Sequence, residues 1–208
     1  HRHSSAASDV YKRQVLEAGK KHNLMVIAPA HHRRIQAGIL SWGQDLDHEH
    51  NPFQCNLGYQ VSLSGKGEWE KKGDYIGKQA LEKMKADLKD GHKPYKLQLV
   101  GFEIGGKPID EYAPDFWLVS PGDGGDPCGF ITSPWYHPEK GKNIAMGYIP
   151  FDGTLNPNGF PKWELGKKFK VHLPDIYADE PGVPVDAVTV DVPFTESFNA
   201  NTREVVKG

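Results

Sequence analysis

The sequence predicts an α+β fold in which helices dominate the first 90 residues and a small antiparallel β-barrel follows. Apolar residues recur at helical spacing in Lys78–Lys89. After Asp90 this periodicity is lost, and short β-like runs alternate with turns rich in Gly, Pro, Asn and Asp. Several short strands with no long helix between them favour an antiparallel barrel.

The chain opens with a segment that does not fit the pattern of the rest. Residues 1–14, HRHSSAASDVYKRQ, lack the apolar centre of a signal peptide, and we interpret them as a non-native or artefactual segment. Val15–His22 follows as the end of a helix, with Asn23 as its stop. Because a natural domain rarely begins inside a helix, we expect the chain to be the C-terminal portion of a longer protein.

Four further elements are expected before residue 90. Leu24–Ile27 is a short apolar run typical of a buried strand. Leu57–Leu63 reads as a second strand, because apolar and polar residues alternate along it. Ala30–Leu40 and Lys78–Lys89 each carry their apolar residues on one helix face and are predicted as helices.

A domain boundary is predicted at Asp90–Pro94, dividing residues 15–92 from residues 93–208. The second part contains six β-like runs separated by turns. These are Tyr95–Ile104, Phe116–Val119, Cys128–Ser133, Asn143–Ile149, Lys168–Leu173 and Val185–Val192.

The overall composition excludes several classes of protein. A net charge of −2 gives no electrostatic footprint for nucleic acid. No apolar run reaches the roughly 18–20 residues that span a bilayer. Two cysteines, Cys55 and Cys128, are too few for a disulfide framework and are expected to be small buried side chains in a reducing, cytoplasmic compartment.

Two segments carry the most specific motifs. Residues 34–58 read RIQAGILSWGQDLDHEHNPFQCNLG, and residues 129–148 read GFITSPWYHPEKGKNIAMGY. Together they resemble the folate-dependent aminomethyltransferase family, whose founding member is the glycine cleavage T-protein. The run Asn51-Pro52-Phe53-Gln54-Cys55 resembles the dimethylsulfoniopropionate demethylases within it. The resemblance covers Val15 to Phe198.

The resemblance implies a fold and a reaction. Residues 15–92 would be the end of a ferredoxin-like folate-binding domain, and residues 93–208 the closing β-barrel. The implied function is methyl or one-carbon transfer to tetrahydrofolate, in particular demethylation of dimethylsulfoniopropionate or a similar small-molecule donor. A glycine cleavage aminomethyltransferase, another folate-dependent demethylase and a non-catalytic folate-binding scaffold stay open as alternatives.

The resemblance also implies what lies outside this sequence. The pterin-binding carboxylates of the family belong to its N-terminal half, so no catalytic residue is assigned here. The partners are therefore that missing half and the methyl donor, with a homodimer left open. The chain alone is expected to be inactive.

Five residues are candidates for cofactor binding, each with a structural alternative. Arg34 would hold the folate glutamate tail or pair with Asp45 or Asp47. Trp42 and Tyr136 would present aromatic faces, with burial in the core the alternative for Trp42 and exposure in a loop, Pro134–Pro138, expected for Tyr136. Asp45 would border the folate channel or accept backbone N–H groups of a solvated loop. Arg203 would approach the glutamate or lie in a solvated tail.

Two further kinds of site are not assigned to this chain, a second folate-binding arginine and a metal site. The family usually has a second arginine four residues before Arg34, where this chain has Ala30. The cluster of carboxylates and imidazoles from Asp45 to His50 contains metal-ligand residue types, but its spacing does not match a helical ligand pair. We therefore predict no metal there, and we interpret His137 as an ordinary loop histidine.

Overall fold

The computed structural model describes residues 2–26, 30–63 and 75–194. The chain divides into two compact units, residues 1–30 and residues 31–208. In the first unit, helix α1 (Arg2–Gly19) continues into the 3-10 turn η1 (Lys20–His22). Asn23 ends this turn in the left-handed conformation (φ 53°), which confirms the predicted stop.

The strand predicted from Leu24 does not form within the described residues. Residues 24–26 have no ladder partner, and Ile27 lies outside the described residues. Helix α1 also includes residues 2–14, so this segment is helical. Its artefactual origin stays a prediction.

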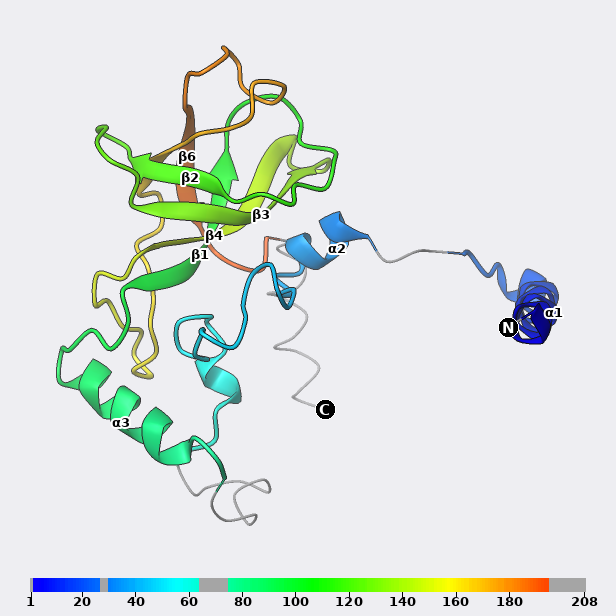
Figure 1. Cartoon of the computed structure of the whole chain (residues 1–208), viewed down its shortest axis with the longest axis horizontal. Helices are drawn as coiled ribbons and strands as arrows, with labels where there is room; N and C mark the ends of the chain where they lie inside the picture. The colour runs from blue at the N-terminus through cyan, green and yellow to red at the C-terminus, as the bar shows by residue number, and fades with distance from the viewer. Residues whose placement is uncertain (1, 27–29, 64–74, 195–208) are drawn as a thin grey trace. The chain divides into compact units, whose positions relative to one another are not determined.

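The second unit contains a closed six-stranded antiparallel barrel, as the sequence predicts (Figure 1). Its strand order is β1-β4-β3-β2-β5-β6, and pairing of β6 with β1 closes it. No helix lies between residues 95 and 192, all of which are described. The strands are β1 (Leu97–Ile104), β2 (Trp117–Pro121), β3 (Gly129–His137), β4 (Lys142–Pro150), β5 (Lys168–Val171) and β6 (Val185–Val190).

Strand β4 is buried on both faces, which explains the continuous apolar run in its sequence. Ala145 and Ile149 point into the barrel core. Ile144, Met146 and Tyr148 point outward into a second core, which Ile35 also joins. Because successive side chains of a strand point to opposite faces, one run of residues serves two cores.

A β-bulge in β3 interrupts its pairing with β4. Ile131 pairs with Gly147 and Ser133 with Met146, so Thr132 is an additional residue on β3. Strand β3 then continues through Tyr136 to His137. The predicted loop at Pro134–Pro138 is therefore wrong for residues 134–137, because β4 pairs with this whole stretch.

The helix predicted over Ala30–Leu40 is shorter in the structure. Helix α2 (His31–Gln36) packs beside β3 and β4 (Figure 1). It ends because Gly38 adopts φ 66°, with the Gly38 N–H bonded to the Ile35 carbonyl and the Ile39 N–H to the Arg34 carbonyl. This arrangement is a glycine C-cap, which the sequence signal of Gly38 could have predicted.

The strand predicted at Leu57–Leu63 is also wrong. Residues Gly58–Gln60 form the 3-10 helix η2, and residues 61–63 have no strand partner. The backbone here is satisfied locally, since the Val61 N–H bonds to the Gly58 carbonyl. Gly58 allows this path, because a Cβ there would lie 2.8 Å from the rings of Phe53 and Phe160.

The predicted helix at Lys78–Lys89 is confirmed as α3. Its Leu88 forms a third apolar cluster with Phe53 and Phe151. The predicted boundary at Asp90–Pro94 falls between α3 and β1, within the second compact unit. Among the described helices, none has the length and apolar character needed to cross a membrane.

Candidate functional site

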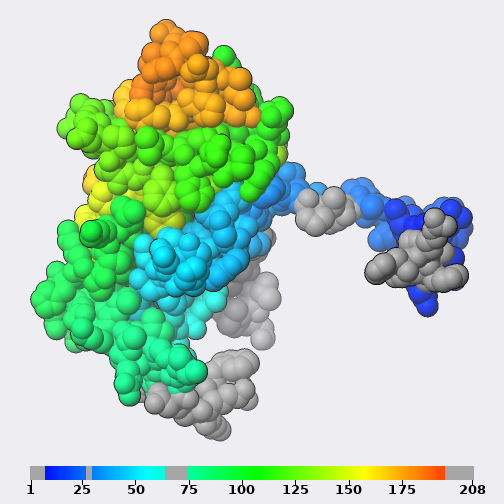
Figure 2. Space-filling model, in the orientation of Figure 1, coloured from blue at the N-terminus to red at the C-terminus, as the bar shows by residue number. Residues whose placement is uncertain are grey.

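The motif residues meet where α2 and the following loop pack against the outside of the barrel. Figure 2 shows this loop in light blue and cyan against the green and yellow atoms of the barrel. At its centre Arg34 and Asp45 form an ion pair, with Nη1 2.7 Å from Oδ2. The carboxylate of Asp45 is fully buried, and the residue is 1% exposed. The ion-pair alternative for Arg34 is thus confirmed.

All five N–H donors of Arg34 have partners within the protein. Nη1 donates to the Asp45 carboxylate and to the Ile39 carbonyl at 3.2 Å. Nη2 donates to Gln44 Oε1 at 3.0 Å and to Ser133 Oγ at 2.8 Å. Nε donates to His31 Nδ1 at 3.3 Å. In this arrangement the guanidinium offers no donor to a further carboxylate.

Each carboxylate oxygen of Asp45 accepts two hydrogen bonds. Oδ2 accepts the Ser41 backbone N–H at 2.8 Å in addition to Arg34. Oδ1 accepts the hydroxyls of Thr132 and Ser133. The predicted acceptance of a backbone N–H group is confirmed for Asp45. Asp47 makes a similar bond, since its Oδ1 accepts the Glu49 N–H. The predicted solvated loop is wrong for Asp45, because its carboxylate is buried. Four hydrogen-bond donors compensate for the loss of hydration of this charge.

The β-bulge explains how two consecutive hydroxyls reach one oxygen. In regular strand geometry Thr132 and Ser133 would point to opposite faces. The additional residue at the bulge removes this alternation, and both hydroxyls turn toward Asp45. The consecutive Thr-Ser pair is visible in the sequence. The bulge that turns both hydroxyls toward Asp45 could not be predicted from it.

Tyr148 extends the network on the other side of the loop. Its hydroxyl donates to the Asp45 backbone carbonyl at 2.7 Å and lies 3.4 Å from the Cys55 Sγ. Burial raises the pKa of both the Tyr148 phenol and the Cys55 thiol, so both stay protonated at neutral pH. Cys55 is a free, buried thiol as predicted, whereas Cys128 is free and only partly buried.

A cluster of aromatic rings lies beside this network. His31 contacts Tyr112, with ring centroids 4.7 Å apart, and stacks on Trp135 at 6.3 Å. His32 lies 6.2 Å from Trp135. Burial, followed by the positive charge of Arg34, lowers the pKa of His31. The imidazole is therefore neutral, which suits its acceptance of the Arg34 Nε–H.

The other predicted site residues lie away from the ion pair. Trp42 is 69% exposed, so the core alternative is wrong for it. Tyr136 neighbours Trp135 on a strand, where adjacent side chains point to opposite faces, and it is Trp135 that reaches α2. Arg203 lies outside the described residues.

The Asp45–His50 segment forms a local contact and no ligand cluster. His50 Nδ1 lies 2.7 Å from Asp47 Oδ1. Within the described ranges, no group of three or more His, Cys, Asp or Glu side chains could hold a metal ion. The absence of a metal in the protein stays a prediction.

Proteins named aminomethyltransferase are homologous to this chain. One from Synechocystis sp. is 32% identical over 117 residues, covering 56% of this chain and 27% of the relative. One from Thermosynechococcus vestitus is 29% identical over 162 residues, covering 77% of this chain and 35% of the relative. The chain thus spans about a third or less of the length of these curated relatives. No protein-family profile matches it.

A solved structure supports the fold. The crystal structure of glycine cleavage system aminomethyltransferase T from Bartonella henselae matches with a TM-score of 0.53 and 20% sequence identity. The match covers 78% of this chain and 37% of that chain. At this identity the likeness concerns the fold alone.

Proposed function

We propose that this chain is the C-terminal part of a folate-dependent one-carbon transferase of the aminomethyltransferase family. The observation that carries the proposal is the sequence similarity to proteins named aminomethyltransferase. The meeting of both motif segments around Asp45 supports it, because residues 34–58 and 129–148 are the parts that resemble that family. The proposal extends to a ferredoxin-like domain completed by residues before this chain, and to a cytoplasmic protein.

The described residues fit tetrahydrofolate in part. The half-exposed ring of Trp135 and the exposed ring of Tyr112 offer faces to a planar pterin or benzoyl ring. Arg34 does not fit the glutamate tail, because its five donors are already used. We therefore assign Arg34 and Asp45 to positioning of the Ser41–Asp45 loop, and we propose the exposed Trp42 as a channel-wall residue. Tyr136 lies on the face of β3 opposite to Trp135, so we leave it out of this wall.

When bound, tetrahydrofolate supplies the nitrogen that accepts the one-carbon group. This chain would hold the channel wall in a fixed position and exclude water. A wall fixed by a buried ion pair and two hydroxyls is suited to this task, since positioning of reactants can account for several kcal/mol of a barrier. No proton transfer is assigned to these residues.

Two donor classes are to be compared. The names of the relatives favour an aminomethyl donor, which yields methylenetetrahydrofolate and ammonia and leaves the carrier of the aminomethyl group as a free thiol. The resemblance of the Asn51–Cys55 run to the dimethylsulfoniopropionate demethylases favours a methyl donor such as dimethylsulfoniopropionate, which yields methyltetrahydrofolate and the demethylated thioether.

The test is an assay of the longer protein that contains this chain, with tetrahydrofolate and each donor in turn. Chromatography separates methylenetetrahydrofolate from methyltetrahydrofolate and so identifies the reaction. Binding of tetrahydrofolate without either product would favour the scaffold alternative. Absence of both binding and turnover would refute the proposal.

A further inference from the structure

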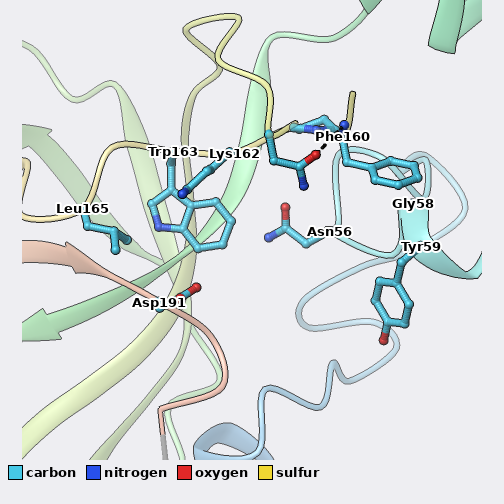
Figure 3. Close-up of a pocket in the computed structure, with 10 residues that line it drawn as sticks. Asn56, Gly58, Tyr59, Phe160, Lys162, Trp163, Leu165 and Asp191 are labelled. Atoms are coloured by element: carbon cyan, nitrogen blue, oxygen red, sulfur yellow. Dashed lines mark hydrogen bonds between the residues drawn. The ribbon is translucent and has the colours of Figure 1, made fainter. Parts of the chain in front are cut away.

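A cavity of about 390 Å³ shares no lining residue with the Asp45 network. It is formed by the segment around η2 and by the connection between β4 and β5 (Figure 3). Figure 3 shows the indole of Trp163 on one side, the rings of Tyr59 and Phe160 on the other, and Asn56 between them. The volume lies in the range of small-molecule pockets, about 300–1,000 Å³.

The walls of this cavity are fixed before any ligand arrives. The β4–β5 connection folds back on itself, with Leu155 bridged to Pro161 and the Asn156 N–H bonded to the Phe160 carbonyl at 2.8 Å. The Trp163 indole N–H donates to the Val190 carbonyl at 3.0 Å. Because its one polar group is used, Trp163 presents only apolar ring surface to the cavity. A preformed wall lowers the entropic cost of binding.

The uncommitted polar groups that line the cavity are mainly donors. Asn156 Oδ1 accepts two backbone N–H groups, from Asn158 at 2.9 Å and from Phe160 at 3.1 Å. Its oxygen must face these donors, which leaves its NH₂ group with no partner among the described residues. Within the same described part of the chain, the Lys162 ammonium also lacks a partner.

Asn56 adds one more donor. Its Oδ1 accepts from Gln98, and its Nδ2 donates to the Leu99 carbonyl at 2.7 Å, which leaves a second N–H. The charged acceptor at the rim is Asp191, and one of its oxygens already accepts the Val192 N–H at 3.1 Å. Amide and ammonium donors beside aromatic walls are complementary to a negatively charged group on an apolar body.

We propose that this cavity binds a small organic anion, with its carboxylate toward Lys162 and the two asparagine amides and its aromatic body against Trp163. The claim is independent of folate chemistry, because none of these residues takes part in the proposed channel wall. The negative charge of Asp191 repels an anion, so the carboxylate of the ligand must lie nearer to Lys162 than to Asp191.

Benzoate is the probe that tests this proposal on the 208-residue chain. Chemical-shift titration of the Trp163 indole N–H should show saturable binding, at least about tenfold tighter for benzoate than for benzyl alcohol or benzylamine. Lys162→Met should weaken benzoate binding about tenfold, the typical loss for one charge-assisted contact. Lys168→Met, an exposed lysine outside the cavity lining, is the matched control and should leave it unchanged.

Asp191→Asn gives a second, independent readout. Removing the carboxylate should leave benzoate binding unchanged or tighten it a few-fold. Preferred binding of benzylamine, lost in Asp191→Asn, would instead indicate a cation site and overturn the proposal. So would no saturable shift with benzoate, or equal benzoate affinities for Lys162→Met and the unaltered chain.

Discussion

At the scale of single residues, Arg34 links parts of the motif region through five side-chain hydrogen bonds. It neutralises Asp45, which is buried and cannot be hydrated in its place. Arg34→Met should therefore destabilise the fold by about 3–5 kcal/mol, the usual cost of leaving a buried charge unpaired. Urea unfolding measures this change. Arg33→Met, on an exposed neighbour, should change the free energy of unfolding by less than about 0.5 kcal/mol.

A double variant distinguishes loss of pairing from loss of packing. Arg34→Met combined with Asp45→Asn removes the unpaired charge and should recover part of the stability lost in Arg34→Met. If the two changes are simply additive, the ion pair is not the source of the effect.

The interpretation of His137 as an ordinary loop histidine is wrong, because the residue is 1% exposed and lies on β3. Its Nδ1 accepts the Lys140 N–H, and its Nε2 has no hydrogen-bond partner among the described residues. Burial lowers its pKa in the folded state, so the unfolded chain binds this proton more readily. The folded state should therefore lose stability as the pH falls below about 6.5, the ordinary histidine value, while above it the effect vanishes.

The measurement is the free energy of unfolding at pH 7.5 and at pH 5.5. His137→Gln cannot titrate and should lose less stability over this interval than the unaltered chain. The neighbouring charges of Glu139, Lys140 and Glu103 are present in both proteins, so the difference reports on His137. Parallel losses would show that its protonation does not contribute.

At the scale of elements, the close approach of β3 and β4 depends on Gly147. A Cβ there would lie 2.5 Å from the Phe130 carbonyl oxygen, a backbone atom that can move only with its strand. Gly147→Ala should therefore destabilise the barrel by about 1–3 kcal/mol, as overpacking does. Thermal unfolding tests this. The control is Lys142→Ala on β4, the strand of Gly147. It removes a surface ion pair with Glu103 of β1 and should cost at most about 1 kcal/mol.

At the scale of the whole molecule, Leu88 links α3 to the rest of the second unit. It is 3% exposed and packs with Phe53, from the loop before η2, and Phe151, which follows β4. Leu88→Ala should cost about 2–5 kcal/mol. If the unit unfolds cooperatively, the amide protons of α3 and those of the barrel strands should lose the same free energy of protection in hydrogen exchange.

The control for this prediction is Lys89→Ala, on the exposed side of the same helix. It should leave the unfolding midpoint almost unchanged. A loss of hydrogen-exchange protection confined to α3 in the Leu88→Ala protein would show that α3 is an independent folding unit. In that case the boundary predicted at Asp90–Pro94 would gain support.

Elements with local sequence signals could be predicted before the structure was known. Helix α3 follows from apolar spacing, and the six strands follow from short runs between turns, because periodicity decides which face can be buried. Gly38 and Asn23 end their helices through conformations that these residues adopt at low cost.

Contacts between distant side chains could be identified only in the folded protein. The sequence alternation at Leu57–Leu63 predicted a strand, but in the part of the chain that the structure describes no strand pairs with it, and a sheet needs such a partner. Asp45 and Thr132 are 87 residues apart in sequence and joined by a hydrogen bond. Their contact depends on a bulge in β3 and on the closure of the barrel. Such positions arise from long-range packing, which no local pattern encodes.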